Sequence, residues 1–225
     1  MSIDVLYSFR RCPFAMRARW SLIYSKKQVE WREVELKNKP KELMQVSPKG
    51  TVPVLITHNG HIIDESIEII KWALRGNDKY DLMRLKNPKE KCLVEKLINE
   101  NDFIFKNHLD KYKYQNRFQD DKAEIHKIYA ERILKRWDNL LKTNEVKYSS
   151  NKVFLTGKRE SIADWCLWPF VRQYFNYEKN FSDIGLELIT LNYWLSRYIN
   201  HPFYELLMKK SKPWSCNNKL KTFPH

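Results

Sequence analysis

The feature that most constrains the fold is a change of hydrophobic periodicity along residues 1–75. An apolar run over residues 3–9 is typical of a strand, and apolar residues three and four apart indicate a helix over Pro13–Ser25. Residues 29–36 then alternate apolar and charged side chains, which predicts a second strand. Because a helix between two strands crosses over the sheet, we expect these two strands to be parallel.

The next residues add a hairpin and two helices to this unit. We predict a short helix over residues 39–46, strands over residues 52–57 and 61–64, and a helix over Ser66–Leu74. The turn residues His58, Asn59 and Gly60 separate the two strands, and the Asn-Gly pair favours a two-residue hairpin turn. The predicted order is therefore β-α-β-α-β-β-α, which is the thioredoxin-like arrangement.

The rest of the chain has the period of helices alone. Apolar residues recur at three and four positions over residues 88–114, 120–141, 161–177 and 184–199. We therefore expect an α/β thioredoxin-like domain over residues 1–76, a linker over residues 77–87 and an all-α domain over residues 88–211. Residues 212–225 lack such a period and are expected to form a basic C-terminal extension.

Composition fits a soluble globular protein with an unusually positive charge. The 225 residues carry a formal net charge of +14, which can attract nucleic acid. The lysines, however, mostly alternate with Asp, Glu and Asn along the predicted helices, as on a solvated face, so dedicated nucleic-acid binding is not expected. No apolar stretch approaches the roughly 20 residues of a membrane span, and the first residues lack a signal peptide. We expect a cytoplasmic protein that does not bind membranes.

Cysteine and histidine spacing argues against two common kinds of site. The four cysteines, Cys12, Cys92, Cys166 and Cys216, are far apart, and no C-x-x-C motif occurs. The sequence therefore predicts neither a zinc ribbon nor a dithiol redox motif, and the six scattered histidines add no metal-ligand pattern. No metal site is expected.

Cys12 is the candidate nucleophile. It lies between a predicted strand and a predicted helix that begins with Pro13, so its thiol is placed at the helix N-terminus. Unpaired amides and the helix dipole favour a thiolate there. A buried apolar cysteine is the alternative, and the strand–turn–helix context favours the reactive thiol. Arg10 and Arg11 would lower the pKa of the thiol further if they point toward it; otherwise they face water.

Two further motifs have both a structural and a ligand-binding interpretation. If the Val52–Pro53 bond is cis, the backbone of Val52 faces the Cys12 helix and could pair with a peptide-like ligand. A trans proline at a strand edge is the alternative. Ser66 is predicted to be a helix N-cap that suits a carboxylate, and Glu65 could accept from a ligand ammonium. A plain helix cap is the alternative there.

Several motifs together point to a known family. They are Cys-Pro-Phe-Ala at residues 12–15, Leu-Lys-Asn-Lys-Pro at 36–40, Val-Pro-Val-Leu at 52–55, Glu-Ser at 65–66, Ser-Ile-Ala-Asp at 161–164 and Leu-Trp-Pro-Phe at 167–170. The Ser-x-x-Asp segment is also an N-capping box in its own right. With this spacing the chain resembles the glutathione transferase superfamily, in particular its omega class. The resemblance implies the glutathione transferase fold, glutathione as co-substrate and a homodimer.

The resemblance also implies a role for each matching residue. Cys12 is the catalytic thiol, which forms a mixed disulfide with glutathione. The implied glutathione-binding residues are Phe14, Lys39 at the glycyl carboxylate, Val52 and Pro53 at the cysteinyl part, and Glu65 and Ser66 at the γ-glutamyl end. Phe170 and Tyr174 are implied to line the acceptor-substrate side, with Phe14.

A cysteine in place of the tyrosine or serine of other classes changes the expected chemistry to thiol–disulfide exchange. Without a second cysteine nearby, a second glutathione resolves the mixed disulfide. We expect a thiol transferase that reduces small disulfides, glutathionylated substrates or dehydroascorbate, with reductive dehalogenation or dethiolation as a close variant. The alternative is a non-catalytic protein of this fold that binds a protein partner, as stringent-starvation-like proteins bind RNA polymerase; the positive charge keeps it open.

Overall fold

The computed structural model describes residues 3–115, 122–177 and 187–224, and the chain divides into two compact units. We call residues 1–78 together with 201–225 the sheet unit, and residues 79–200 the helical unit. Among the residues described, no helix combines the length and the apolar character that a bilayer span requires.

The sheet unit is built on five strands in the order β4-β3-β1-β2-β5. They are β1 (Val5–Ser8), β2 (Val29–Glu33), β3 (Val54–Ile56), β4 (Ile62–Ile63) and β5 (Thr222–Phe223). β1 and β2 are parallel, with Tyr7 opposite Arg32, and β3 pairs antiparallel with both β1 and β4. The predicted parallel pair and the predicted hairpin are confirmed.

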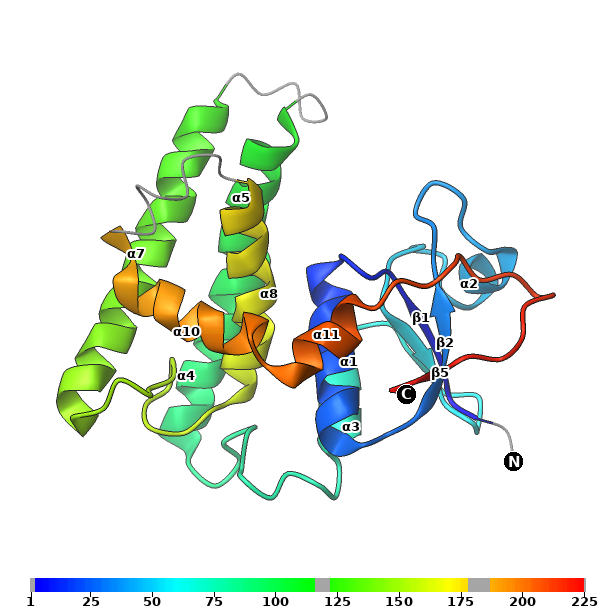
Figure 1. Cartoon of the computed structure of the whole chain (residues 1–225), viewed down its shortest axis with the longest axis horizontal. Helices are drawn as coiled ribbons and strands as arrows, with labels where there is room; N and C mark the ends of the chain where they lie inside the picture. Colours follow the sequence, from blue (N-terminus) through cyan, green and yellow to red (C-terminus); the bar gives the residue numbers. More distant parts are fainter. Residues whose placement is uncertain (1–2, 116–121, 178–186, 225) are drawn as a thin grey trace. The chain divides into compact units, whose positions relative to one another are not determined.

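Helices cover both faces of this sheet (Figure 1). α1 (Pro13–Ser25) and α3 (Ser66–Leu74) pack against each other on one face, and α2 (Lys41–Val46) lies on the other. Successive strand residues point to opposite faces, so Leu6 of β1 is buried on one side and Tyr7 on the other. Tyr7 joins Leu43 of α2 in a buried cluster. The predicted thioredoxin-like fold is therefore confirmed.

The hairpin between β3 and β4 turns at the predicted residues, 58–60, but not through the predicted two-residue turn. The Gly60 N–H donates to Thr57 O at 2.7 Å and the Thr57 N–H to His61 O at 2.9 Å, so the loop contains three residues. Gly60 has a φ of 84°, whereas Asn59 does not have a positive φ. A two-residue type I′ turn needs positive φ at both central positions. The Asn-Gly pair thus marks the hairpin correctly but not the length of its loop.

The C-terminal residues belong to the sheet unit. This unit takes up the chain again at residue 201, whereas the all-α domain was predicted to extend to residue 211. α11 (Pro202–Met208) packs against α1, and β5 pairs antiparallel with β2. The Trp31 N–H also donates to Lys221 O at 2.7 Å. Phe223 is 1% exposed, and its ring lies edge-on to Trp31 with the centroids 5.6 Å apart. A two-residue strand carries no alternating pattern, so periodicity could not reveal it.

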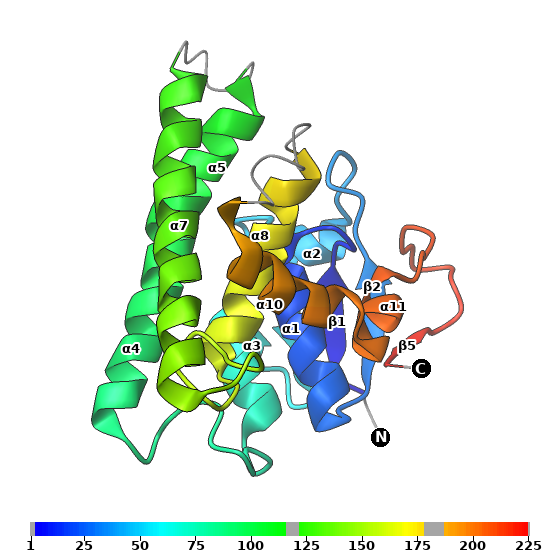
Figure 2. The same cartoon turned by 60° about the vertical axis from the view of Figure 1, so that its left-hand side comes forward.

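The regular elements described in the helical unit are helices. They are α4 (Pro88–Asn99), a π-helical segment η1 (Glu100–Phe105), α5 (Lys106–Lys113), α7 (Ala123–Tyr148), α8 (Ile162–Tyr177) and α10 (Ile189–Ile199). α4, η1 and α5 follow one another as one rod, and α7 packs along α5 (Figure 2). Trp137, Trp165, Trp168 and Trp194 fill the core. Residues 120–121 and 184–186 of two predicted helices lie outside the described residues.

Asp164 organises the start of α8. Its carboxylate accepts from the backbone N–H and the hydroxyl of Ser161, each at 2.9 Å, from Leu155 N–H at 2.9 Å and from the Trp194 indole at 3.0 Å. Burial raises the pKa of Asp164, and these donors oppose that rise. The predicted Ser–Asp box therefore holds the helix start, with the Ser161 hydroxyl acting as a donor to the carboxylate.

Candidate active site

Cys12 lies immediately before α1, as its strand–turn–helix context predicts. Its backbone is extended, with φ −72° and ψ 121°, and its carbonyl accepts from Met16 N–H at 2.8 Å, which makes it the N-cap of α1. Pro13 occupies the first helical position. The side chain is half-buried and makes no capping hydrogen bond to α1. The sulfur is thus held at the positive end of the helix dipole.

The Val52–Pro53 peptide lies beside this thiol. The bond is cis, and Pro53 immediately precedes β3. The Cys12 thiol donates to Val52 O, with 3.5 Å between the sulfur and the oxygen. Val52 is 8% exposed and packs in the same cluster as Tyr7. The loop before β3 and the N-terminus of α1 therefore meet at the sulfur, in the arrangement expected for a cis peptide.

Ser66 and Glu65 mark the start of α3, shifted by one residue from the prediction. The N-cap is Glu65, with φ −112° and ψ 126°, and Ser66 is the first helical residue. Ser66 is 3% exposed, and its hydroxyl oxygen accepts from Arg17 Nε at 2.9 Å. Because Arg17 supplies a donor, the hydroxyl proton of Ser66 can be directed to a ligand carboxylate. Motif spacing misses Arg17, because its partner Ser66 lies 49 residues away in the sequence.

Lys49 is a second site residue that the motifs do not reveal. Its ammonium lies 3.1 Å from both Asp64 Oδ2 and Glu65 Oε1. The hydrogen bonds to Asp64 and Glu65 raise the pKa of Lys49. Two carboxylates and one ammonium leave a net negative charge beside the start of α3, which suits a ligand ammonium.

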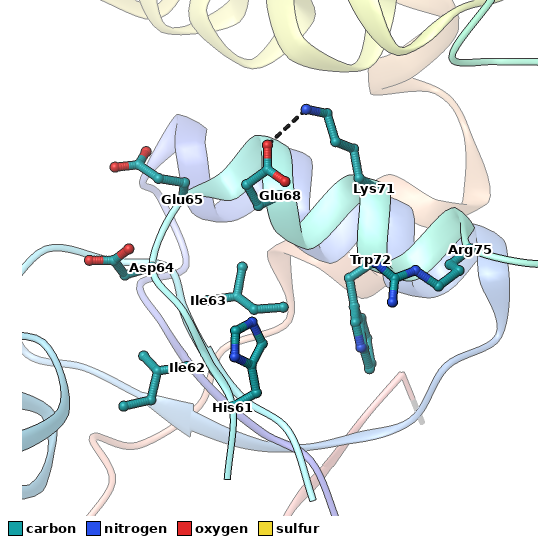
Figure 3. Close-up of a pocket in the computed structure, with 9 residues that line it drawn as sticks. All are labelled: His61, Ile62, Ile63, Asp64, Glu65, Glu68, Lys71, Trp72 and Arg75. Atoms are coloured by element: carbon teal, nitrogen blue, oxygen red, sulfur yellow. Dashed lines mark hydrogen bonds and ion pairs between the residues drawn. The ribbon is translucent and has the colours of Figure 1, made fainter. Parts of the chain in front are cut away.

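A pocket of about 280 Å³ runs along β4 and α3 next to this charged group (Figure 3). Its lining includes Ile63 and Trp72, and Arg75 lies near Trp72 at the far end. The carboxylates of Asp64 and Glu65 point to the same side, away from Trp72 and Arg75. Asp64 and Glu65 also line this pocket, and their carboxylates lie at its end next to the start of α3.

Lys39 approaches the loop that leads to Val52. A Cβ atom on Gly50 would lie 3.2 Å from Lys39 Nζ and 2.9 Å from Met44 Sδ. Gly50 also has a φ of +59°, and this backbone conformation favours glycine, whereas the flexible Met44 and Lys39 side chains could move away from a Cβ atom. The exposed Lys39 thus places its ammonium near the backbone of this loop.

Phe170 and Tyr174, predicted on the acceptor side, lie instead in the core of the helical unit. Both side chains are 0% exposed. The Tyr174 hydroxyl donates to Glu131 Oε1 at 3.0 Å, and its ring centroid is 6.3 Å from that of Phe105. The assignment of these two residues to an acceptor pocket is therefore corrected. An apolar stripe on a helix looks the same in sequence whether it forms core or lines a pocket.

Arg10 and Arg11 differ in their surroundings. The Arg10 N–H donates to Glu33 Oε1 at 2.8 Å, and its guanidinium donates to Met208 O at 3.2 Å. Arg10 therefore connects the loop before Cys12 to β2 and to the end of α11, while Arg11 is exposed.

No group of three or more His, Cys, Asp or Glu residues that could hold a metal ion occurs in the part of the chain that the structure describes.

A thioredoxin-like sheet unit joined in sequence to an all-helical unit defines the glutathione transferase fold, and comparisons with known proteins agree. Residues 6–79 match the model of the glutathione S-transferase N-terminal domain. The chain is 26% identical over 171 residues to glutathione S-transferase omega-1 of Mus musculus, covering 75% of this chain and 65% of that protein. It is 33% identical over 104 residues to a probable glutathione transferase of Aplysia californica, covering 45% of this chain and 100% of that one.

Solved structures share the whole fold. Ure2p in complex with S-hexylglutathione has a TM-score of 0.76 at 15% identity, covering 92% of this chain and 99% of that one. The chain belongs to the glutathione S-transferase superfamily. It spans about two thirds of the length of the omega-class relatives, 65% of the mouse protein and 68% of the rat protein.

Proposed function

We propose that this protein is an omega-like, glutathione-dependent thiol transferase in which Cys12 reacts through a mixed disulfide with glutathione. The observation that carries the proposal is the Cys12 sulfur at the N-terminus of α1, 3.5 Å from the carbonyl oxygen of Val52. A thiol at a helix N-terminus is a candidate nucleophile, and an adjacent backbone segment can align a peptide-like ligand beside it.

The proposed reaction is two successive thiol–disulfide exchanges. The Cys12 thiolate attacks the glutathione sulfur of a mixed disulfide, so that a Cys12–glutathione disulfide forms and the substrate thiolate leaves and takes up a proton. The thiolate of a second glutathione then attacks that disulfide, which releases oxidised glutathione and restores the Cys12 thiolate. With dehydroascorbate as acceptor, two glutathione molecules supply two electrons and two protons, and the products are ascorbate and oxidised glutathione.

The other motif residues suit the remaining parts of glutathione. We propose Lys39 for the glycyl carboxylate, Val52 and Pro53 for the cysteinyl backbone, Ser66 for the γ-glutamyl carboxylate, Glu65 for its ammonium, and Phe14 beside the thiol. The first amides of α3 add to the carboxylate site, because a helix N-terminus favours an anion. The Arg17–Ser66 hydrogen bond of 2.9 Å supports this orientation of the hydroxyl.

Replacement of Cys12 tests the mechanism. Cys12→Ser should lower turnover of 2-hydroxyethyl disulfide with glutathione at least about a hundredfold, because a serine hydroxyl is not ionised near neutral pH. Glutathione binding, measured by calorimetry, should change little. Wild-type protein exposed to oxidised glutathione should gain a glutathione adduct on Cys12 in its mass spectrum.

The exposed Cys92 provides a matched control, since Cys92→Ser removes a thiol outside the candidate site. This variant should keep both turnover and the adduct. Turnover that survives in Cys12→Ser would remove Cys12 from the mechanism.

A second candidate function is partner binding without catalysis, which the net charge of +14 supports. The partner would be a protein, as for the stringent-starvation-like proteins that bind RNA polymerase. Folded protein that fails to bind a glutathione matrix would favour this function over the transferase. Retention on the matrix with release by free glutathione would favour the transferase.

The resemblance to glutathione transferases also supports a homodimer in the cytoplasm. Sedimentation equilibrium should then give twice the mass of the 27.3 kDa chain. A monomer at micromolar concentration would contradict the proposed dimer without affecting the proposed chemistry.

A further inference from the structure

Arg19 is a fully buried arginine on α1, seven residues after Cys12. Its side chain is 0% exposed, and its three hydrogen bonds all go to backbone carbonyl oxygens. Nε donates to Ala15 O at 3.4 Å, and the two terminal nitrogens donate to Leu207 O at 2.9 Å and Arg10 O at 2.6 Å. Carbonyl dipoles solvate a guanidinium but do not cancel its charge. Burial of a positive charge costs free energy of folding, so a buried arginine without a side-chain carboxylate bonded to it points to a role for its charge.

The direction of this side chain relates it to Cys12. Helical side chains lean toward the helix N-terminus, and the hydrogen bond to Ala15 O shows Arg19 reaching back by one turn. Its terminal nitrogen then bonds the carbonyl of Arg10, two residues before Cys12. The guanidinium therefore holds the short loop that delivers the thiol to the start of α1.

The C-terminal segment closes the other side of the guanidinium. Leu207 O belongs to the last turn of α11. The rings of Trp31 in β2 and Phe223 in β5 lie 5.8 Å and 5.9 Å from the Arg19 guanidinium carbon, measured to their centroids. These groups exclude water, and charges interact more strongly where water is excluded.

The charged residues around Arg19 determine how strongly its charged form is favoured. Burial lowers the pKa of Arg19 to about 10, while Glu33 and Cys12 favour its charged form and Arg10 opposes it. Burial also raises the pKa of Glu33, against the hydrogen bond from the Arg10 N–H and the charge of Arg19. Because charge interaction is mutual, a guanidinium stabilised by the Cys12 thiolate must stabilise that thiolate equally. Exposed Arg11 is the remaining cation in the loop.

We propose that Arg19 is the positioning residue of Cys12: its buried guanidinium fixes the loop at residues 10–12 and favours the thiolate. The proposal rests on the proposed function only for what the thiolate does once it is formed. It extends the site from the motif residues to a second layer that includes the C-terminal segment.

The rate of Cys12 alkylation by iodoacetamide as a function of pH, without glutathione, tests this role. Peptide mass spectrometry separates Cys12 from Cys92 and Cys216, which are exposed. Arg19→Gln should raise the pKa of the Cys12 thiol by about one unit or more, since it removes a nearby opposite charge. Alkylation below both pKa values should then be about tenfold slower for each unit.

Glu33→Gln provides a second variant with the opposite expected sign. It removes the negative charge that opposes Arg19, so the pKa of the Cys12 thiol should fall. The amide oxygen can still accept from the Arg10 N–H, so the loop keeps that anchor. A purely structural role of Arg19 would not move the pKa in opposite directions in these two variants. If Arg19→Gln does not fold, Glu33→Gln alone decides, and an unchanged or raised pKa in it overturns the proposal.

Arg84 in the helical unit is the matched control. It is 1% exposed, and its guanidinium donates to Asp81 O at 2.5 Å, Arg159 O at 2.6 Å and Glu160 O at 2.7 Å. Arg84→Gln should leave the Cys12 alkylation profile unchanged whatever it does to stability. A wild-type thiol pKa in folded Arg19→Gln would overturn the proposal. Loss of turnover in Cys12→Ser is measured separately, so failure of the transferase function and failure of this proposal are distinguishable.

Discussion

At the scale of single residues, charge balance at the start of α3 determines how the candidate site receives a cationic group. The carboxylates of Asp64 and Glu65 share one ammonium, that of Lys49. In the proposed function, the ammonium of the γ-glutamyl group uses the same carboxylates. Lys49 then occupies part of the position that the ligand needs.

Removal of the Lys49 charge should therefore strengthen glutathione binding. Lys49→Met leaves two carboxylates without their internal cation, and we expect glutathione to bind about two- to fivefold more tightly, which matches the modest strength of exposed ion pairs. Titration calorimetry at low ionic strength measures the change. The difference from wild type should shrink at high salt, because salt screens exposed charges.

Lys71 offers a control on the same helix. Its ammonium pairs with Glu68 at 2.8 Å, one turn along α3, and both side chains are exposed (Figure 3). Lys71→Met should change glutathione affinity less than Lys49→Met does. Weaker binding in Lys49→Met would mean that Lys49 orients the two carboxylates, and would contradict competition for them.

At the scale of elements, long periodic segments and the Ser161–Asp164 box were predictable, whereas the exact ends of short turns and caps were not. The α1 and α3 helices have the predicted ranges because each has a terminal signal, such as Pro13 or Gly76, and α3 also has a clear apolar face. The Asn-Gly loop and the cap of α3 are off by one residue, since several neighbouring residues satisfy the same turn or cap chemistry.

The residues of the candidate site also divide into those that the sequence indicates and those that it does not. The motif residues Cys12, Val52 and Ser66 have backbone positions that local sequence chemistry indicates. Arg17 and Lys49 act on partners far away in the sequence, so only the folded sheet brings them to the site. Distant pairings of this kind leave no periodic trace in the sequence.

Glu160, in the segment before α8, makes the free energy of unfolding depend on pH. Burial raises the pKa of Glu160 to about 7, although the Tyr198 hydroxyl of α10 donates to its carboxylate at 2.7 Å. The folded state therefore binds this proton more tightly than the unfolded chain, whose glutamate has a pKa near 4.5. The free energy of unfolding must then fall as pH rises from about 4.5 to about 7.

Glu160→Gln should remove this loss. A neutral amide accepts from Tyr198 at any pH, so above pH 7 the variant should be more stable than wild type by about 3 kcal/mol, and the difference should shrink toward pH 4.5. Urea unfolding at pH 5 and pH 8 measures it. The exposed Glu95→Gln should leave the wild-type pH dependence in place. Parallel pH curves for wild type and Glu160→Gln would contradict the burial of an ionised Glu160.

At the scale of the whole molecule, the chain returns to its first domain after the helical unit. Residues 201–225 belong with residues 1–78, and β5 becomes the edge strand beside β2. The Trp214 N–H donates to Glu33 O at 2.8 Å, and the Arg32 guanidinium lies 4.2 Å from the Trp214 ring centroid. The basic extension expected from composition is thus a structural part of the sheet unit.

Deletion of residues 212–225 should accordingly destabilise the sheet unit and leave the helical unit unaffected. The deletion removes the acceptor of the Trp31 N–H, Lys221 O, and the buried Phe223 ring, whose burial contributes about 2 kcal/mol. It also exposes the edge of β2 to pairing with other chains. Hydrogen exchange should speed up at Trp31 and across β2, while α7 exchanges as in wild type.

Two point variants distinguish the contribution of the buried Phe223 side chain from that of residues 212–225 as a whole. Phe223→Ala should reproduce most of the faster exchange in β2, because it removes the side chain that seals Trp31. Leu220→Ala, at a position that is 62% exposed in the same segment, should not. If β2 exchanges at the wild-type rate in the deletion variant, the C-terminal residues do not stabilise the sheet. Since the Phe223 ring also shields the Arg19 guanidinium from water, the deletion should weaken the effect of Arg19 and raise the pKa of the Cys12 thiol in the same preparation.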